Sequence, residues 1–574
     1  MSTVAKQLVD SLAAQGVKRV YGVPGDSLNG ITDAIRTSKK LTWSHVRHEE
    51  TAAFAAAAEA ALTGDLAVCA GSCGPGNLHL INGLFDAQRS RVPVLAIAAQ
   101  IPSDEVGSNY FQETHPQDLF RECAVYTELV SNPEQMPRLL RIAMQEAISK
   151  RGVAVLVIPG DVALQDAVSS DLATVTAPEP KILPSDDELA DLAKLLNSSQ
   201  KITILAGAGA AGAHEELVAL ADTLAAPVVH ALRGKEYVEY DNPFDVGMTG
   251  LLGFASGYRA MDASEVVLVL GSDFPYQQFY PKDAKVVQVD IDGAQLGRRA
   301  PLAMGLVGTV KDTAAALQPL LTRKTKRNHL EDALKHYRST REKLDDLATP
   351  ARKKHALHPQ YVAQRIDTLA DDDAVFIPDV GSPVVYAARY LTMNGKRRII
   401  GSFNHGSMAN AVPHAIGASS VDPSRQIVTL SGDGGLAMLL GDLITLKQSK
   451  LPVNVVVFNN SSLNFVELEM KAAGFVTYGT DLDNPDFAAI AEACGVKGFT
   501  VTESSQLDDV LKEAFAYDGP TLVDVHTGRQ ELTLPPKIGM EQAKGFALYA
   551  LRSVLSGRGD ELLDLASTNW RQLF

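Results

Sequence analysis

Short runs of apolar, mostly β-branched residues alternate along this chain with longer segments in which apolar residues recur at helical spacing. The short runs predict strands at residues 19–22, 66–70, 94–98, 154–158, 202–206, 266–270, 286–290, 374–378, 427–430, 453–458 and 521–525. Strands that alternate with helices in this way pair as parallel sheets covered by helices. The pattern therefore predicts an α/β protein built from doubly wound parallel sheets.

Two polar stretches, residues 176–187 and 323–358, interrupt this alternation. We predict three α/β domains at residues 1–180, 181–330 and 331–530, followed by a tail at 531–574. The first and third domains contain similar units, each with a strand, a glycine-rich turn, a helix, a basic residue, a proline and a strand, at residues 66–99 and 427–460. Either these are homologous domains that face one cofactor from opposite ends, or the likeness is that of any β-α-β unit.

The 574-residue chain is acidic, with 53 Lys and Arg against 68 Asp and Glu and a formal net charge of -15. A phosphate backbone would be repelled on average, so we expect no nucleic-acid partner. Four scattered cysteines are too few for a disulfide framework and lack the paired spacing of a zinc site. No uninterrupted run of about 18 apolar residues occurs, so we expect no segment that crosses a membrane.

A Gly-Asp-Gly turn carries the clearest chemical signal. Asp433 follows the predicted strand at 427–430, and Asn460 follows the next strand, so both side chains meet at the carboxyl edge of a parallel sheet. Carboxylate and amide oxygens suit Mg²⁺, which shares its coordination sphere with phosphate groups. Gly434 and Gly435 let a diphosphate approach the backbone where a helix begins. An ordinary turn is the alternative for Gly-Asp-Gly alone, but the Asn-Asn pair at this distance makes the combination specific.

These motifs resemble those of thiamine-diphosphate enzymes, and the resemblance extends over all three domains. It implies that the carbonyl of Ser462 is a third Mg²⁺ ligand, and that Glu49, within Arg-His-Glu-Glu, hydrogen-bonds the aminopyrimidine ring of the cofactor. A glutamate in a dry pocket can share a proton with that ring and so promote loss of the thiazolium C2 proton. The alternative, a carboxylate that complements the helix dipole, suits Glu50 better.

The resemblance assigns further cofactor contacts to the third domain. Gly406, through its carbonyl, and Met408, through its bulk, would hold the cofactor in a bent form, with Ser407 between them. Core packing is the alternative for Met408. A second set of contacts surrounds the metal loop and comprises Asp433, Gly434, Gly435, Asn460, Ser461, Ser462, Leu463, Asn464, Phe465 and Val466.

Near the start of the middle domain, Gly-Ala-Gly-Ala-Ala-Gly at residues 207–212 matches the dinucleotide pattern GxGxxG. The acidic residue that such sites place about twenty positions later is missing, so the match does not favour a simple NAD site. Asp290, at the end of a later strand, is a candidate to hold a ribose or adenine group instead. Two loops after other strands are further candidates, and they consist of Thr249, Gly250, Leu251 and Leu252, and of Ser272, Asp273, Phe274, Pro275 and Tyr276.

Within this family the chain resembles the pyruvate:quinone oxidoreductases, also called pyruvate oxidases, for example in Leu-Arg-Gly-Lys-Glu at 232–236 and Ser-Phe-Asn-His-Gly-Ser-Met at 402–408. The resemblance implies that the middle domain binds FAD. It also implies that pyruvate is oxidatively decarboxylated to acetate and CO₂, with electrons passing through FAD to membrane ubiquinone. The apolar pocket for the 2-oxo acid would be lined by Phe111, Gln112, Val380 and Phe465, and buried aromatic packing is the alternative role for such side chains.

The last residues suit an amphipathic helix, because apolar side chains recur at helical spacing with charged residues largely opposite: Leu562, Leu563, Ala566, Trp570 and Leu573. We expect this helix to bind membrane lipid, so that a cytoplasmic enzyme attaches peripherally to the inner face of the cell membrane. The alternative is a terminal helix docked on a neighbouring domain. Both states can alternate if reduction of the flavin releases the helix.

Glu49 and Asp433 lie on similar domains, so the resemblance implies active sites formed between the subunits of a homotetramer. Two other functions stay open at this point. One is an acetolactate-synthase-like carboligase in which FAD is structural, and the other is a non-catalytic, peripheral flavoprotein.

Overall fold

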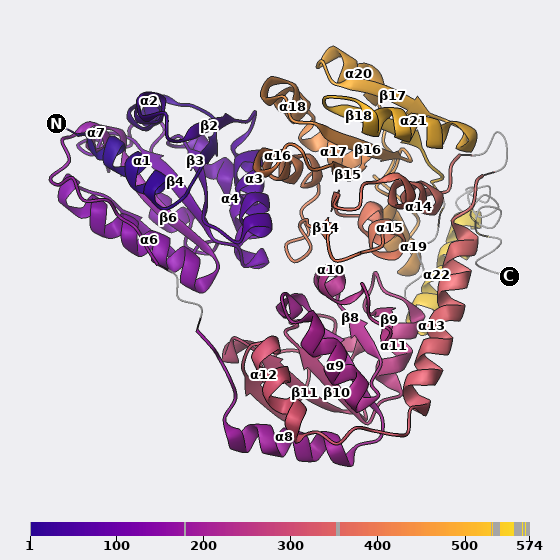
Figure 1. Ribbon diagram of the computed structural model, residues 1–574. Coiled ribbons are helices and arrows are strands. Elements are labelled where there is room, and N and C mark those ends of the chain that lie inside the picture. Colours follow the sequence, from indigo (N-terminus) through magenta and orange to yellow (C-terminus); the bar gives the residue numbers. More distant parts are fainter. Residues whose placement is uncertain are drawn as a thin grey trace.

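The computed structural model describes residues 2–176, 180–351, 356–529, 531, 540–555, 565 and 569, and these residues form three α/β domains (Figure 1). Each domain contains a six-stranded parallel sheet flanked by helices. This architecture confirms the predicted fold class. The strands predicted from the apolar runs are all present, with ends that differ from the prediction by at most two residues. None of the described helices is long and apolar enough to cross a membrane.

The N-terminal domain contains strands β1 (Arg19–Gly22), β2 (Thr42–His45), β3 (Ala67–Gly71), β4 (Val94–Gln100), β5 (Tyr126–Leu129) and β6 (Val153–Pro159). They pair in the order β2-β1-β3-β4-β6-β5. The helices of this domain are α1 (Val4–Ala14), α2 (Asn29–Ser38), α3 (Glu49–Thr63), α4 (Pro75–Ser90), α5 (Pro116–Leu119), α6 (Met136–Lys150) and α7 (Gly160–Leu164).

The C-terminal domain contains strands β13 (Val375–Pro378), β14 (Arg398–Ile399), β15 (Ile427–Gly432), β16 (Val453–Asn459), β17 (Lys497–Val501) and β18 (Thr521–His526). Its helices are α14 (Pro359–Leu369), α15 (Ser382–Tyr390), α16 (Ala411–Val421), α17 (Asp433–Met438), α18 (Leu443–Ser449), α19 (Asn464–Ala472), α20 (Phe487–Ala493) and α21 (Ser504–Ala516). The strand order is β14-β13-β15-β16-β18-β17. Counted from the first strand of each domain, this order is identical to that of the N-terminal sheet, which supports the reading of two homologous domains.

The middle domain has a different topology. Its strands are β7 (Ile202–Ala206), β8 (Val228–His230), β9 (Asp245–Met248), β10 (Val266–Leu270), β11 (Lys285–Asp290) and β12 (Met304–Val307), and they pair in the order β12-β11-β10-β7-β8-β9. Its helices are α8 (Asp186–Ser198), α9 (His214–Leu224), α10 (Lys235–Val238), α11 (Ala255–Asp262), α12 (Val310–Leu317) and α13 (Asn328–Leu347). Counted from β7, the order is 6-5-4-1-2-3, which is the arrangement of dinucleotide-binding sheets.

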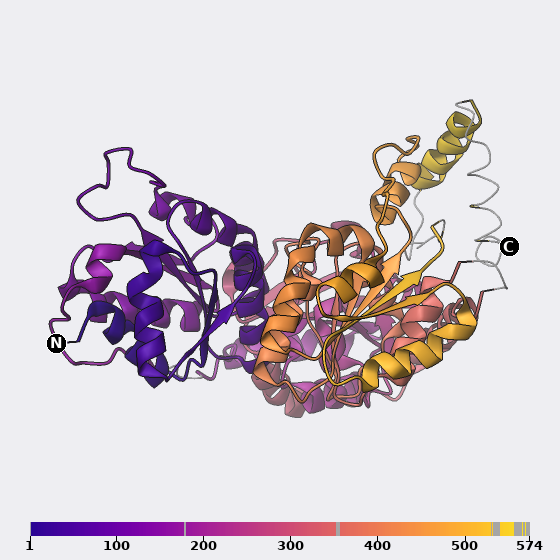
Figure 2. The same cartoon turned by 90° about the horizontal axis from the view of Figure 1, so that it is seen from above.

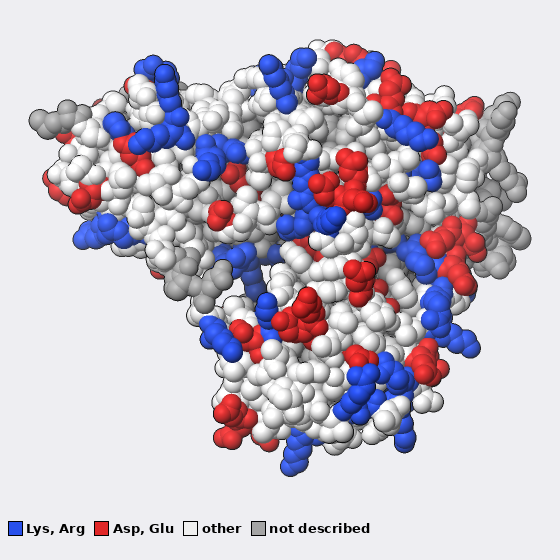
Figure 3. Space-filling model, viewed as in Figure 1, with Lys and Arg blue, Asp and Glu red and all other residues white. Residues whose placement is uncertain are grey.

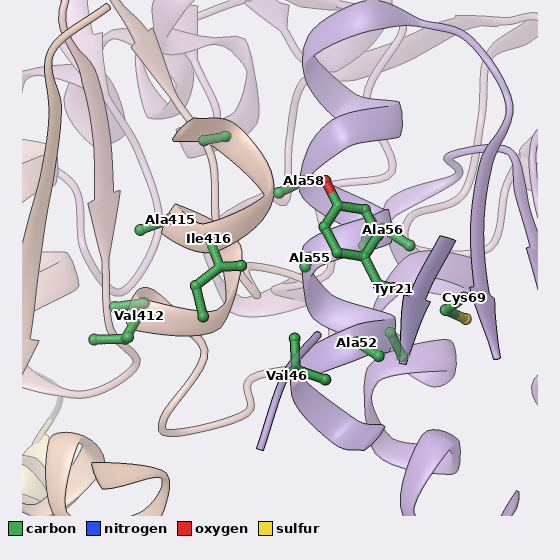
Figure 4. Close-up of a cluster of buried hydrophobic side chains, with 14 of the residues drawn as sticks. Tyr21, Val46, Ala52, Ala55, Ala56, Ala58, Cys69, Val412, Ala415 and Ile416 are labelled. Carbon is green, nitrogen blue, oxygen red and sulfur yellow. The ribbon is translucent and has the colours of Figure 1, made fainter. Parts of the chain in front are cut away.

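The N- and C-terminal domains meet where α3 crosses α16 (Figure 4). Ala55 of α3 and Ala415 of α16 are both fully buried at this crossing. A Cβ atom on Gly417 would lie only 2.1 Å from the carbonyl oxygen of Ala55, so the two helices touch backbone to backbone. Only small side chains permit such a close approach, because larger ones would hold the helix axes about 8–10 Å apart or more.

Buried hydrogen bonds flank this crossing on both sides. The carboxylate of Asp442 accepts from the backbone N–H of Arg47 at 3.0 Å and from the hydroxyl of Thr51 at 2.5 Å. On α16, Nε2 of His414 lies 3.1 Å from the carboxylate of Asp86 on α4. A shift of either domain would leave these groups buried and unpaired, so the hydrogen bonds favour one relative orientation.

Helix α22 (Met540–Leu555) packs along α19 at the margin of the C-terminal domain (Figure 2). A Cβ atom on Gly545 would lie 1.8 Å from the carbonyl oxygen of Ala472, and Tyr549 is fully buried beside Lys471. The predicted amphipathic helix with Leu562, Leu563, Ala566, Trp570 and Leu573 falls outside the described residues, so its membrane role stays a prediction.

Replacing Gly417 by alanine should destabilise the protein by about 2 kcal/mol or more, because the new methyl group overlaps the Ala55 carbonyl and forces α16 away from α3. Thermal unfolding of the full chain measures this. Gly441→Ala is the matched control, since a Cβ atom there meets nothing within 4 Å. The control should stay within about 0.5 kcal/mol of the parent chain. Equal effects of the two substitutions would contradict the proposed role of the crossing.

Candidate functional site

Asp433 lies at the carboxyl end of β15, in the first turn of α17, and is 3% exposed. Its Oδ2 accepts hydrogen bonds from the backbone N–H groups of Asn460 (3.1 Å) and Ser461 (2.7 Å) and from the side-chain amide of Asn484 (2.8 Å). Burial raises the pKa of Asp433, and these hydrogen bonds, with one from Gly434, oppose that shift. The carboxylate is therefore held in one orientation beside the Asn460 loop.

The Asn460 loop is shaped by side chains that the sequence motif does not contain. Oδ1 of Asn460 accepts the backbone N–H of Ser462 at 3.0 Å, and the Ser462 hydroxyl donates to Glu467 at 2.6 Å. Glu467 in turn pairs with the buried Lys471 at 2.8 Å. Asp433, Asn460 and the Ser462 carbonyl form a set of oxygen donors, which is the ligand type that Mg²⁺ prefers. The residues present thus fit the predicted ion.

Asp379 connects the predicted pocket residue Val380 to two predicted cofactor segments, 406–408 and 433–435. Its Oδ1 accepts from the backbone N–H of Val380 (3.0 Å) and the side-chain amide of Asn410 (2.9 Å), and Asn410 follows the 406–408 segment. Its Oδ2 lies 1.9 Å from the position that a Cβ atom on Gly435 would take, so only glycine fits there. Burial raises the pKa of Asp379 to about 7, against the effect of these hydrogen bonds.

Met408 lies against the Gly-Asp-Gly turn. Its Cε is 3.6 Å from the position of a Cβ atom on Gly434, and Gly406 has a φ of +79° that favours glycine. The structure therefore brings together the segments at 379–382, 406–408, 433–435 and 460–466. The absence of side chains at Gly434 and Gly435 lets Leu463 and Asp379 pack directly on this turn. The oxygen donors of the Asp433 site lie beside the same turn, so this region fits thiamine diphosphate with its metal.

Glu49 is the first residue of α3 and is 8% exposed. Its Oε2 lies 2.9 Å from Nδ1 of His79 on α4, and the His79 ring stacks on His48 at 4.2 Å between centroids. In the described part of the chain, Glu49 forms no hydrogen bond to the C-terminal domain. Glu50 is linked to that domain only through Asn82, whose side-chain amide donates to Glu50 (2.7 Å) and to the Ser407 hydroxyl (2.9 Å).

The four predicted pocket residues lie on three separate segments of the chain. Phe111 is 77% exposed in the loop after β4. Gln112 beside it has a φ of +64° and accepts a weak hydrogen bond from the Cys73 thiol at 3.4 Å. Val380 precedes α15 and Phe465 lies in the first turn of α19, and both are partly buried. A pocket for a 2-oxo acid that all four residues line stays a prediction.

The middle domain has the features of a dinucleotide cradle. A Cβ atom on Gly207 would lie 2.6 Å from the carbonyl oxygen of Gly271, so the loops after β7 and β10 touch through their backbones. Thr249 is 3% exposed and its hydroxyl has no hydrogen-bond partner among the described residues. A buried hydroxyl of this kind suits a ligand that supplies the missing partner. Asp290 is also buried, at the end of β11.

Two site residues were not anticipated from the sequence. Asn484 lies 51 positions beyond Asp433, and His79 lies 30 positions beyond Glu49. Asn484 belongs to no motif, and His79 lies within the glycine-rich unit at residues 66–99 but was not singled out there. The strand order and the start of α4 bring them to the site, so a single sequence carries no signal that would have identified them.

Three family models match the chain in succession. The thiamine pyrophosphate enzyme N-terminal TPP binding domain matches residues 2–119, the central domain of these enzymes matches 189–317, and their C-terminal TPP binding domain matches 379–525. Together the matches place the Glu49 region, the dinucleotide cradle and the Asp433 site each in a different domain type of one family.

Individual proteins are similar over most of the chain. An uncharacterized 42.6 kDa protein of Pseudomonas amyloderamosa is 57% identical over 64% of this chain and 94% of its own length. The putative thiamine pyrophosphate-containing protein YdaP of Bacillus subtilis is 39% identical over 98% of both chains. Pyruvate oxidase of Lactiplantibacillus plantarum is 32% identical over 92% of this chain and 89% of its own length.

Replacing Asn484 by leucine should weaken Mg²⁺-dependent binding of thiamine diphosphate about tenfold, because the Asp433 carboxylate loses one of the donors that orient it. Calorimetric titration at fixed Mg²⁺ measures the affinity. Asn394→Leu, at an exposed turn of the same domain, should leave the affinity unchanged. Wild-type affinity in Asn484→Leu would show that the backbone N–H groups alone orient Asp433.

Proposed function

The chain belongs to the thiamine pyrophosphate enzyme family, and on this basis we propose that it catalyses the oxidative decarboxylation of pyruvate with a quinone as electron acceptor. The reaction is pyruvate plus quinone plus water giving acetate, carbon dioxide and quinol. Its cofactors are thiamine diphosphate, Mg²⁺ and FAD. The acceptor is ubiquinone in the membrane.

One observation carries this proposal: a single chain combines both halves of a thiamine site with a buried dinucleotide cradle in a Rossmann-ordered sheet. A decarboxylase that releases an aldehyde needs no dinucleotide, whereas an oxidase needs an electron carrier. The similarity to a pyruvate oxidase over 92% of the chain also supports the proposed oxidation of pyruvate.

The protein residues have distinct tasks in this reaction. Asp433, Asn460 and the carbonyl of Ser462 would hold Mg²⁺, and Met408, which lies against the Gly-Asp-Gly turn, would support the ring system of the cofactor. When bound, thiamine diphosphate supplies the nucleophilic carbon and the electron sink for loss of CO₂, and FAD takes up two electrons. Glu49 holds the proton that is exchanged with the aminopyrimidine ring. His79, 2.9 Å away, orients the Glu49 carboxylate.

We assign the complete site to two subunits of a homotetramer. Glu49 pairs with His79 of its own domain, and large apolar side chains of this domain are exposed, with Leu78 45%, Tyr110 44% and Phe111 77% exposed. Exposed large apolar side chains are typical of a surface that a partner covers. A second copy that brings its C-terminal domain to this face would complete a dry pocket.

Glu49→Gln should reduce pyruvate-dependent bleaching of the flavin by at least a hundredfold, because glutamine cannot hold the proton that the aminopyrimidine ring exchanges. Anaerobic absorption spectroscopy of the enzyme with thiamine diphosphate, Mg²⁺ and pyruvate measures the rate. Glu50→Gln is the matched control, since its amide oxygen can still accept from Asn82. It should bleach at close to the parent rate.

The same assay separates the proposed reaction from its rivals. An artificial quinone should be reduced in step with pyruvate consumption. Acetolactate without acceptor reduction would establish a carboligase, and a flavin that pyruvate never bleaches would identify a non-catalytic flavoprotein. Unchanged bleaching in Glu49→Gln would remove Glu49 from its assigned role.

A chain that ends at Leu555 should lose pyruvate-dependent binding to lipid vesicles while it still reduces a soluble acceptor. This truncation keeps α22, which packs on α19, and removes the residues assigned to the amphipathic helix. Vesicle flotation with and without pyruvate measures the binding. Flotation that persists in the truncated chain would contradict a membrane role for residues 556–574.

A further inference from the structure

The order of strands in the middle sheet identifies where its ligand lies. The order reverses between β7 and β10, and in sheets of this topology the ligand occupies the crevice outside the carboxyl ends of the strands at that point. The loop after β7 contains Gly207 and Gly209, and the loop after β10 begins with Gly271. A Cβ atom on Gly209 would lie 2.7 Å from the Cα of Gly271. The two loops therefore touch backbone to backbone at the point where the strand order reverses.

Arg233 lies directly against this glycine turn. It follows β8 in a short 3-10 turn, Leu232–Gly234. A Cβ atom on the neighbouring Gly234 would lie 2.8 Å from the carbonyl oxygen of Ala206 and 3.1 Å from the Cα of Gly207. The backbone around Arg233 is thus packed on the same turn that approaches a dinucleotide in Rossmann sheets.

The side chain of Arg233 leaves the middle domain and reaches the N-terminal domain. One Nη2–H donates to the carbonyl oxygen of Ser90 at 2.8 Å, at the end of α4. A guanidinium carries five N–H donors, and no other hydrogen bond and no ion pair of Arg233 is found within the described residues. Most of its hydrogen-bonding capacity is therefore available to a ligand.

A second arginine adds to the positive charge at this place. Arg91 follows Ser90 directly, and its charge acts on Arg233 and also on Asp290 and Asp292 at the end of β11. In the described part of the chain the guanidinium of Arg91 has neither an ion pair nor a hydrogen bond. Burial lowers the pKa of Arg233, and the like charge of Arg91 acts in the same direction.

The carboxylates nearest to Arg233 are committed to other partners. Asp86 is paired with His414, and Glu236 is paired with Arg398 at 2.8 Å. Neither the Arg233 nor the Arg91 guanidinium has an ion pair among the described residues, and the charge of Arg91 acts on Asp290 and Asp292 at the end of β11. Seen from outside, positive and negative side chains alternate over the three domains, and Lys and Arg also gather where the N-terminal and middle domains meet (Figure 3).

We propose that Arg233, with Arg91 beside it, binds the diphosphate of the dinucleotide in the middle domain, and that this anion fastens the N-terminal domain to the middle domain. The inference rests on the proposed function, because it takes FAD as that dinucleotide. Two guanidiniums match the two negative charges of a diphosphate, and their planar donors suit its oxygens. The single bond to Ser90 keeps Arg233 aimed across the domain boundary.

The test uses full-length Arg233→Met and Arg233→Lys, with Arg259→Met as the matched control on an exposed helix position of the same domain. Each flavin-depleted protein is titrated with FAD, with ADP and with adenosine. Arg233→Met should bind FAD and ADP at least tenfold more weakly and bind adenosine as the parent does. The FAD and ADP affinities of Arg233→Lys should lie between those of the parent and Arg233→Met, because a lysine keeps the charge but not the planar donors. The control should match the parent for all three ligands.

A separate measurement tests whether the bound dinucleotide holds the N-terminal and middle domains together. Added FAD should raise the Tm of the parent chain, and the rise should be much smaller in Arg233→Met, because stabilisation by a ligand follows its affinity. ADP binding by Arg233→Met at the parent affinity would overturn the assignment. Equal losses for adenosine and ADP would also overturn it, because adenosine carries no phosphate.

The outcome separates this inference from the proposed function. FAD binding that depends on Arg233, in a chain that never transfers electrons from pyruvate, would refute the proposed function and leave the diphosphate assignment in place. Normal pyruvate oxidation with parent-like FAD affinity in Arg233→Met would refute the diphosphate assignment and leave the proposed function in place.

Discussion

The close crossing of α3 and α16 is the constraint on which the rest of the site depends. Glu49 begins α3, and α16 follows the 406–408 segment by two residues, so the crossing fixes the Glu49 half-site and the 406–408 half-site relative to each other within one chain. Contact between Gly417 and the Ala55 carbonyl leaves no room for sliding. The hydrogen bonds of Asp442 then lock the start of α3 onto the C-terminal domain.

Buried carboxylates held by amide donors give the cofactor region its shape. Asp433 and Asp379 are both almost fully buried, and neither has a cation as its main partner; each accepts instead from backbone N–H groups and an asparagine side chain. Burial disfavours the charged form, while the hydrogen bonds favour it, and the raised pKa values show that burial outweighs them. A bound divalent cation would reverse this balance at Asp433.

The strand orders of the three sheets suit different parts of the predicted site. The first and third share one strand order, which suits two halves of a single site, whereas the middle sheet has the order of dinucleotide-binding proteins. Arg233 lies at the boundary between these two architectures, with its backbone on the middle sheet and its guanidinium on the N-terminal domain. Binding of one anion there would couple domains that otherwise have separate cores.

The sequence alone determined the elements that are buried and the motifs that are local. The strands it predicted have continuous apolar runs, while six of the seven that it missed are the edge strands of the sheets, most of them short or half exposed, such as β2 and β17. It also placed Asp433, Asn460 and Glu49 on the correct elements, because glycine turns and strand ends are local signals. Only the tertiary structure decided the strand orders, the α3–α16 contact and the positions of His79, Asn484 and Arg233. The physical reason is that these depend on contacts between residues far apart in the chain, and hydrophobic periodicity carries no record of which distant partner a residue meets.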